Sequence, residues 1–208
     1  MTGVSLASFV AGMGVGLTVA VPIGPMGLLC IQRTLAFGLE AGFATGLGAA
    51  TVHLALGTMT AFGFGAVLLA WTGSQIFSFV SAGLLFWFAA RIMRCSVPVG
   101  PAPSQREGWL RFYGSAILFG VSNPLAILLF AAALPVFAEG SDAEAAPLLV
   151  AGVFLGSIAW WICLATTISL IRNRLSSRII GITTRASGLM LAGLGAFTMA
   201  NAFGLELP

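Results

Sequence analysis

Charged side chains are scarce in this chain of 208 residues: they make up 7% of it, and lysine is absent. A soluble domain carries roughly 25% charged residues, which keep its surface hydrated. Hydrophobic residues instead reach 59%, and the mean hydropathy is +1.05. This composition excludes a soluble enzyme, a nucleic-acid-binding protein and a disordered chain. It indicates a membrane protein whose partner is the lipid bilayer and whose chain crosses it several times.

Residues that bind metals or carry out catalysis are also few. The three cysteines, Cys30, Cys95 and Cys163, lie far apart, and His53 is the one histidine. They form neither a CxxC pair nor a cluster with metal-ligand spacing. The sequence also has no recognisable catalytic triad, paired carboxylate or glycine-rich phosphate loop. We therefore expect no cofactor, no metal site and no enzymatic activity.

Six apolar stretches follow one another along the chain, and a helical crossing needs roughly 20 apolar residues. They predict an all-α membrane protein with six transmembrane helices in a single domain, 1–208. The stretches are 6–32, 41–66, 75–93, 112–138, 147–171 and 186–205. The least certain boundary is the end of the second stretch, because Gly63-Phe64-Gly65 could end that helix early.

The arginines predict the topology. With six crossings, all nine arginines fall on connections that share one side of the membrane, which the positive-inside rule makes cytoplasmic. The connection between helices four and five instead holds Glu139, Asp142 and Glu144. Both termini would then lie outside. The expected location is the bacterial cytoplasmic (inner) membrane.

The two halves of the chain resemble each other. Residues 16–29 align with residues 115–128, so that Pro25 lies over Pro124. Weaker matches follow in helices two and five and in helices three and six. We expect repeat one over about 1–94, repeat two over about 111–208 and a cytoplasmic connection at 95–110. Three crossings per repeat make the two repeats inverted, and inverted repeats with broken helices are typical of secondary transporters.

Proline predicts a break in helix one. Pro22 and Pro25, with Gly24 between them, remove backbone donors and should unwind about one turn of helix. Backbone groups freed inside a membrane must face protein or a wet cavity. The restarted helix would point its positive end at that cavity, which suits a carboxylate. We interpret the motif as a substrate-binding site, and the alternative is a kink used only for packing.

A second break is predicted in helix four, at Asn123 and Pro124. An asparagine buried in a membrane needs a partner, and its amide can both donate and accept hydrogen bonds. Substrate is one such partner. Capping of the restarted helix is the other role open to Asn123, with proline in the first helical position.

His53 lies near the middle of helix two, where a titratable side chain indicates function. We take it as the candidate for proton coupling or substrate contact. The alternative is a packing role, because His53 belongs to a stripe of mostly small residues that close helix packing favours. Thr51 and Trp160 are candidates for lining a cavity, although packing also explains the tryptophan. The stripe comprises Gly42, Gly46, Ala49, His53, Gly57 and Thr60.

Five motifs in order resemble the LysE/RhtB family of bacterial amino-acid exporters, over nearly the whole chain. The run from Val21 to Leu35 resembles the family's helix-one signature. Two others match its helix-two glycine motif and its helix-four Asn-Pro motif. The four remaining segments are 46–51, 122–127, 152–161 and 187–195.

The resemblance implies amino-acid efflux by a secondary active exporter driven by an ion gradient, with a proton or another coupling ion as partner. It implies substrate-binding roles for Pro22, Pro25 and Pro124, with Gly24 and Asn123 beside them. Many relatives have an acidic residue after the helix-two glycines, where this chain has His53. A zwitterionic or neutral substrate is therefore favoured over lysine.

Two other functions stay open at the level of sequence. Remote relatives of the family move divalent metal ions, but such sites need more carboxylate, histidine or cysteine ligands than this chain offers. A non-transporting membrane scaffold would need a partner protein, and the short cytoplasmic connections leave little surface for one. The sequence also leaves open a homo-oligomer.

Overall fold

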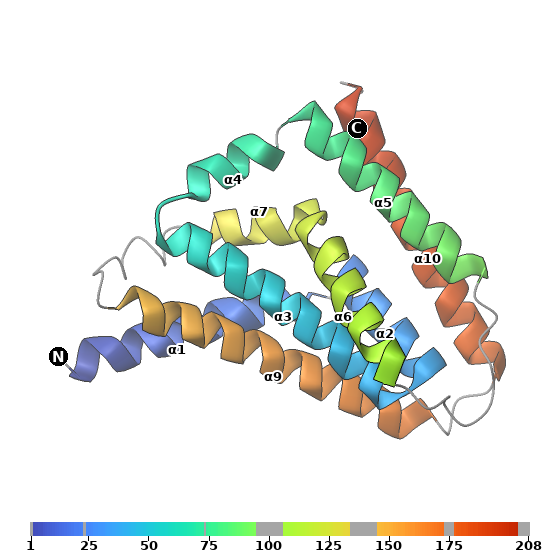
Figure 1. Cartoon of the computed structure of the whole chain (residues 1–208), viewed down its shortest axis with the longest axis horizontal. Coiled ribbons are helices and arrows are strands. Elements are labelled where there is room, and N and C mark those ends of the chain that lie inside the picture. Colours follow the sequence, from blue (N-terminus) through green and yellow to red (C-terminus); the bar gives the residue numbers. More distant parts are fainter. Residues whose placement is uncertain are drawn as a thin grey trace.

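The computed structural model of the chain is helical throughout the residues it describes, which confirms the predicted all-α class (Figure 1). It describes residues 2–22, 24–72, 74–94, 106–133, 145–172 and 177–203. Residues 95–105 of the predicted connection at 95–110 lie outside these ranges, as does the acidic loop at 139–144. Residues 106–110 are helical, so the predicted end of the connection at 110 is wrong by five residues, because their polar side chains do not prevent a helix.

The first apolar stretch forms two helices. Helix α1 runs over Thr2–Ala20 and helix α2 over Pro25–Phe37. Between Leu6–Ala20 and Pro25–Phe37 the axis bends by 75°. Proline provides the physical reason, because it lacks the backbone N–H and clashes with the preceding turn. Pro25 occupies the first turn of α2, where a missing N–H costs nothing.

The second stretch also divides. Helix α3 covers Leu39–Ala61, and a short helix α4 covers Gly65–Thr72. Gly63 stands between them with φ of 84°, and the Phe64 N–H donates to the Met59 carbonyl. This is the glycine-dependent way of ending a helix. The early end at Gly63-Phe64-Gly65 is therefore what the chain adopts. Helix α5, Gln75–Arg94, matches the third stretch.

The second half repeats the break. Helix α6 covers Arg106–Val121 and helix α7 covers Pro124–Ala132, with Ser122 and Asn123 between them. Helix α9, Ala146–Arg172, matches the fifth stretch. Helix α10 spans Ser177–Ala202, so the predicted start at residue 186 is wrong by nine residues. The polar residues before 186 suggested a connection, but they continue the helix, and Arg185 is exposed on it.

Two long helix pairs frame the molecule (Figure 1). Helices α1 and α9 pack along one edge, and α5 packs against α10 along another. Helix α3 lies inside this frame and contacts α9, α6 and α2. The two breaks, α1–α2 and α6–α7, therefore lie among the central helices rather than at the outer edges.

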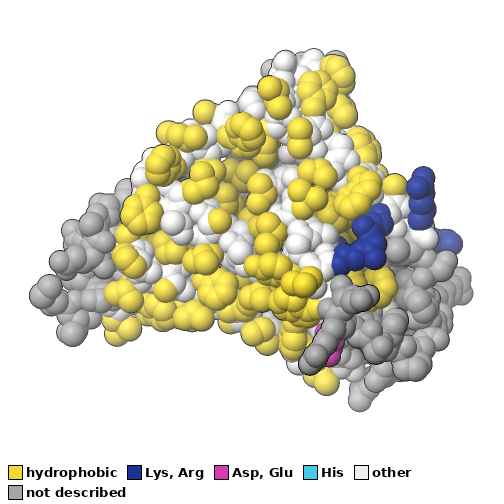
Figure 2. Space-filling model, viewed as in Figure 1, with side chains coloured by type: hydrophobic (Ala, Val, Ile, Leu, Met, Phe, Trp, Pro, Cys, Tyr) yellow, Lys and Arg dark blue, Asp and Glu magenta, His cyan; other side chains and the backbone are white. Residues whose placement is uncertain are grey.

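The surface fits a bilayer. Three helices, α3, α5 and α9, are long and apolar enough to cross a membrane, and α1 with α2 makes a fourth if the bent pair counts as one span. Hydrophobic side chains are spread over the described part of the visible face, and the visible arginines gather at one end of it (Figure 2). The chain is a multi-pass membrane protein.

Candidate functional site

A small cavity lies where the two helix breaks meet. Its volume is about 30 Å³, which has room for a water or two and not for an amino acid. Six helices and both breaks contribute to its wall. The lining residues are Val19, Ala20, Pro22, Gly24, Met26, Gly27, Ala49, Val52, His53, Gly120, Asn123, Ala126, Leu129 and Trp161.

Two helix N-termini meet at this cavity. Helix α2 begins at Pro25 and its next residues, Met26 and Gly27, line the cavity. Helix α7 begins at Pro124, and Asn123 and Ala126 line the same space. The first N–H groups of a helix have no partner within the helix and form its positive end. The C-terminal ends of α1 and α6 also line the cavity, through Ala20 and Gly120, so partial positive and partial negative helix ends meet there.

His53 contributes the titratable side chain of the cavity wall, and it is 5% exposed. Its Nδ1 lies 2.8 Å from the Ser157 hydroxyl oxygen on α9. The Trp161 indole N–H donates to that same oxygen at 3.2 Å. The Ser157 hydroxyl keeps a second lone pair and its one proton, so His53 Nδ1 either accepts from Ser157 or donates to it, according to the tautomer of the imidazole.

The stripe of small residues on α3 is the surface that packs against α9. A Cβ built on Gly42 would overlap Ala165, and one built on Gly46 would overlap Trp161. Further along, Gly57 faces Val153. His53 lies in the middle of this interface. The packing interpretation of the stripe is thus realised, and His53 combines a hydrogen bond to α9 with a place in the cavity wall.

The structure brings together four of the residues that the sequence singled out: Pro22, Gly24, His53 and Asn123 all line the small cavity. Pro25 lines a second cavity on the other side of the α1–α2 break. Pro124 is the first residue of α7. The roles of these residues in binding and coupling stay predictions.

The other two candidates lie elsewhere. The Thr51 hydroxyl donates to the Leu47 carbonyl and lies 3.1 Å from the Tyr113 hydroxyl on α6. Trp160 is partly buried against the hydrophobic core, whereas Trp161 lines the cavity. Sequence reasoning therefore selected Trp160 rather than its neighbour Trp161, and it did not single out Ser157. The four-residue spacing of Ser157 and Trp161 on one helix face was the available signal.

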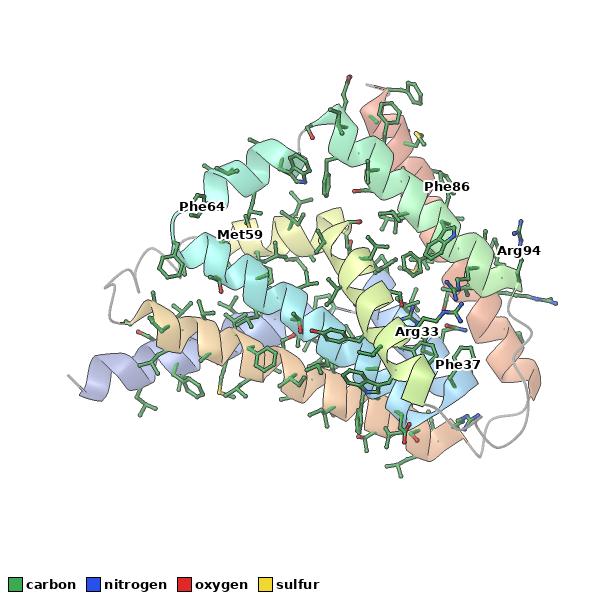
Figure 3. The ribbon with its side chains drawn as sticks, in the orientation of Figure 1. Arg33, Phe37, Met59, Phe64, Phe86 and Arg94 are labelled. Atoms are coloured by element: carbon green, nitrogen blue, oxygen red, sulfur yellow. The ribbon has the colours of Figure 1, made fainter. Side chains whose placement is uncertain are left out.

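Arg33 is a second residue whose importance the sequence did not predict. It is 7% exposed and lies on α2, where Figure 3 labels it together with Phe37. Its guanidinium donates to the Thr45 hydroxyl, the Phe112 carbonyl and the Ser115 hydroxyl, at 3.1, 3.0 and 2.8 Å. It also lies 5.4 Å from the centre of the Phe112 ring. This buried cation thus ties α2 to α3 and α6.

A comparison with protein families gives a match that covers most of the chain. Residues 17–202 match the model of the LysE type translocator family. The chain belongs to the LysE type translocator family. This result confirms the family resemblance that the five motifs carry. The family is one of transporters, so the chain is a translocator and not an enzyme.

Two relatives cover most of this translocator. The chain is 24% identical over 195 residues to the "Putative amino acid efflux protein YcgF" of Bacillus subtilis (strain 168), covering 91% of this chain and 93% of that protein. It is 31% identical over 169 residues to the "Uncharacterized membrane protein YahN" of Escherichia coli (strain K12), covering 73% and 74%. No solved structure matches the translocator.

Metal ligands do not gather in the part of the translocator that the structure describes. No group of three or more histidine, cysteine, aspartate or glutamate side chains there could hold a metal ion. The metal-exporter alternative gains no support from these residues.

Proposed function

We propose that this translocator is a secondary active exporter of amino acids or close derivatives, coupled to the proton gradient. The observation that carries the proposal is the convergence of two broken helices on one cavity lined by His53 and Asn123. Helix breaks inside a membrane are tolerated where the backbone lines a cavity, and transporters use them to bind ions and polar groups. The name of the Bacillus subtilis relative agrees with amino acid efflux.

The charges available at the break suit a zwitterion. The N–H groups that begin α2 and α7 attract the substrate carboxylate. The carbonyl end of α1, near Val19 and Ala20, attracts the ammonium group. The described wall contains no acidic side chain that would favour a second positive charge on the substrate. A zwitterionic amino acid therefore fits better than lysine.

Two inverted three-helix repeats support transport by alternating access. In this arrangement α1–α2 corresponds to α6–α7, α3 to α9 and α5 to α10, which completes six crossings. Each half has its break before a proline, and α3 packs on α9 as α5 packs on α10. The cavity is too small for an amino acid in this conformation. Binding then requires the two repeats to separate on one side of the membrane at a time.

The orientation follows from the arginines. The arginine-rich connections lie in the cytoplasm and both termini lie outside, in the bacterial inner membrane. The gathering of the visible arginines at one end of the molecule supports this orientation (Figure 2). The chain functions as one transmembrane domain, 1–208.

The proposal is tested with inside-out vesicles, in which an exporter takes up substrate. A panel of labelled amino acids is offered with and without an imposed proton gradient, and vesicles without the protein serve as control. We expect gradient-dependent uptake of neutral amino acids. If no amino acid is taken up but a labelled divalent cation is, metal export replaces the proposal. If nothing moves and a partner protein co-purifies, the scaffold alternative replaces it.

His53 is tested with His53→Asn, because the asparagine amide keeps hydrogen-bonding capacity near Nδ1, where Ser157 lies, but does not titrate. We expect gradient-driven uptake to fall at least tenfold while exchange of internal for external substrate continues. If the variant keeps its gradient dependence, His53 is a packing residue of the α3–α9 interface. If uptake and exchange are lost together, His53 contacts substrate rather than relaying protons.

A further inference from the structure

A second and larger cavity flanks the same helix break. Its volume is about 460 Å³, within the range of roughly 300–1,000 Å³ that small-molecule sites occupy. Helix α10 packs against α2 and forms the facing wall. The lining residues are Pro22, Gly24, Pro25, Met190, Gly193, Leu194 and Phe197.

The two cavities share part of their lining. Pro22 and Gly24 contribute to both, so the break between α1 and α2 separates a cavity that includes His53 and Asn123 from one whose lining is apolar. An amino acid has the same division, with a charged backbone at one end and a side chain at the other. A substrate whose α-carbon lies at the break would direct its side chain toward α10.

We propose that the cavity against α10 receives the side chain of the exported amino acid and selects bulky apolar side chains such as those of leucine, methionine and phenylalanine. This inference rests on the proposed function, because it places the polar end of the substrate in the small cavity after separation of the repeats has enlarged that cavity. The wall offers Met190, Leu194 and Phe197 and no charged residue. A lysine or arginine side chain would lose its hydration there without a countercharge.

Gly193 is the residue that keeps this space open. A Cβ built on Gly193 meets nothing within 4 Å, so a side chain added there begins in empty space beside the cavity. Gly83, on the neighbouring helix α5, has the same property and does not line the cavity. The same substitution can therefore be made at both glycines. At Gly193 it fills the cavity, and at Gly83 it serves as the control because it does not.

The competing occupant is a lipid chain. Met190 and Phe197 are 50% and 49% exposed, so the cavity opens to the outside of the chain. A lipid occupant predicts that filling the cavity alters all substrates alike. A side-chain site predicts that filling it alters large substrates alone. The selectivity ratio, rather than the absolute rate, therefore decides between the two.

The experiment compares uptake of labelled leucine, phenylalanine, alanine and lysine into inside-out vesicles. For the wild type we expect leucine and phenylalanine to be preferred. Gly193→Leu should lower leucine uptake at least tenfold and leave alanine uptake within about twofold, since one methylene changes discrimination in an apolar pocket by roughly 10–200-fold. Gly83→Leu should leave both rates unchanged.

A second variant distinguishes a change of selectivity from a folding defect. Phe197→Ala lengthens the cavity, so the preference should move from leucine toward phenylalanine, a change of ratio that partial misfolding does not produce. An unchanged leucine-to-alanine ratio in Gly193→Leu overturns the inference and assigns the cavity to lipid. Wild-type uptake of alanine or lysine in preference to leucine overturns it while leaving export intact. The absence of any uptake removes the proposed function and this inference together.

Discussion

The Ser157 hydroxyl occupies a position where one atom serves two side chains. It accepts the indole N–H of Trp161 from its own helix and lies 2.8 Å from His53 Nδ1 on α3. A hydroxyl oxygen accepts up to two hydrogen bonds and donates one, so Ser157 can pair with either tautomer of the imidazole. Ser157 thereby fixes the ring orientation of His53, much as outer partners orient metal-binding histidines.

Ser157→Ala should therefore affect transport as well as stability. The substitution leaves the Trp161 N–H and His53 Nδ1 without their partner, and an unsatisfied buried polar group costs about 1–3 kcal/mol. We expect gradient-driven uptake to fall about tenfold and the thermal midpoint in detergent to decrease. The measurement pairs vesicle uptake with fluorescence-detected size-exclusion after heating.

Thr58→Val is the control for this change, because the Thr58 hydroxyl donates only within its own helix, to the Leu54 carbonyl. We expect this variant to transport at close to the wild-type rate. A Ser157→Ala protein that transports normally, with its gradient dependence intact, would show that the hydrogen bond to His53 has no functional role.

Residues such as Ser157 show where sequence stops being sufficient. Pro22, His53 and Asn123 could be predicted because proline, histidine and asparagine are chemically conspicuous inside an apolar segment. Trp160 and Trp161 are equally conspicuous and adjacent, and neighbours on a helix point about 100° apart. Which of them faces the cavity depends on the rotation of α9 against α3, which only tertiary packing sets.

Close backbone contact joins helices α1 and α9. Gly12 and Gly16 face α9, and Cβ atoms built on them would overlap the carbonyl oxygens of Leu149 and Val153. Gly152 and Gly156 face α1 in the same way, against Phe9 and Met13. Both helices thus present a GxxxG pair to each other. Small residues at this spacing let membrane helices approach closely.

Two glycines of α1 that lie two residues apart, Gly14 and Gly16, test this interface, because their substitutions should change the thermal midpoint in opposite directions. Gly16→Ala forces α1 away from the Val153 carbonyl and should lower the thermal midpoint by several degrees. Gly14 is exposed, and a Cβ built on it meets nothing within 4 Å. Gly14→Ala should therefore raise the midpoint slightly, because alanine stabilises a helix by about 1 kcal/mol relative to glycine. Equal effects of the two substitutions on thermal unfolding would contradict the close packing.

At the scale of elements, the breaks could be predicted and the partners could not. Pro25 and Pro124 act on their own turns of helix, so local sequence suffices. The small-residue stripe of α3 predicted a packing face but did not name α9 as its partner. The start of α10 was misplaced because its arginines and threonines have the composition of a connection, although they continue the helix. A helix can begin with polar residues, because an apolar composition is needed only where a helix contacts lipid.

Over the whole molecule, Arg33 connects parts that belong to different halves of the chain. It lies on α2 and bonds Thr45 on α3, within the first half, and Phe112 and Ser115 on α6, within the second. A further bond, from the Arg172 Nε–H to the Leu35 carbonyl, joins α9 to the same end of α2. The hydrogen-bond partners of Arg33 are uncharged, so what stabilises the buried guanidinium is the number and geometry of these hydrogen bonds. Separation of the halves at this end requires them to break.

Arg33→Lys should accordingly destabilise the closed arrangement while keeping the positive charge. Lysine concentrates its donors on one ammonium and does not reproduce the planar fork that reaches three acceptors at once. Each lost bond to a charged group costs about 1.5–3 kcal/mol. We expect a thermal midpoint several degrees lower and faster labelling of a cysteine introduced at Tyr113, since that end opens more often. Arg94→Lys, at an exposed position at the end of α5, should change neither quantity. Unchanged labelling together with unchanged stability in Arg33→Lys would show that Arg33 does not hold the two halves together.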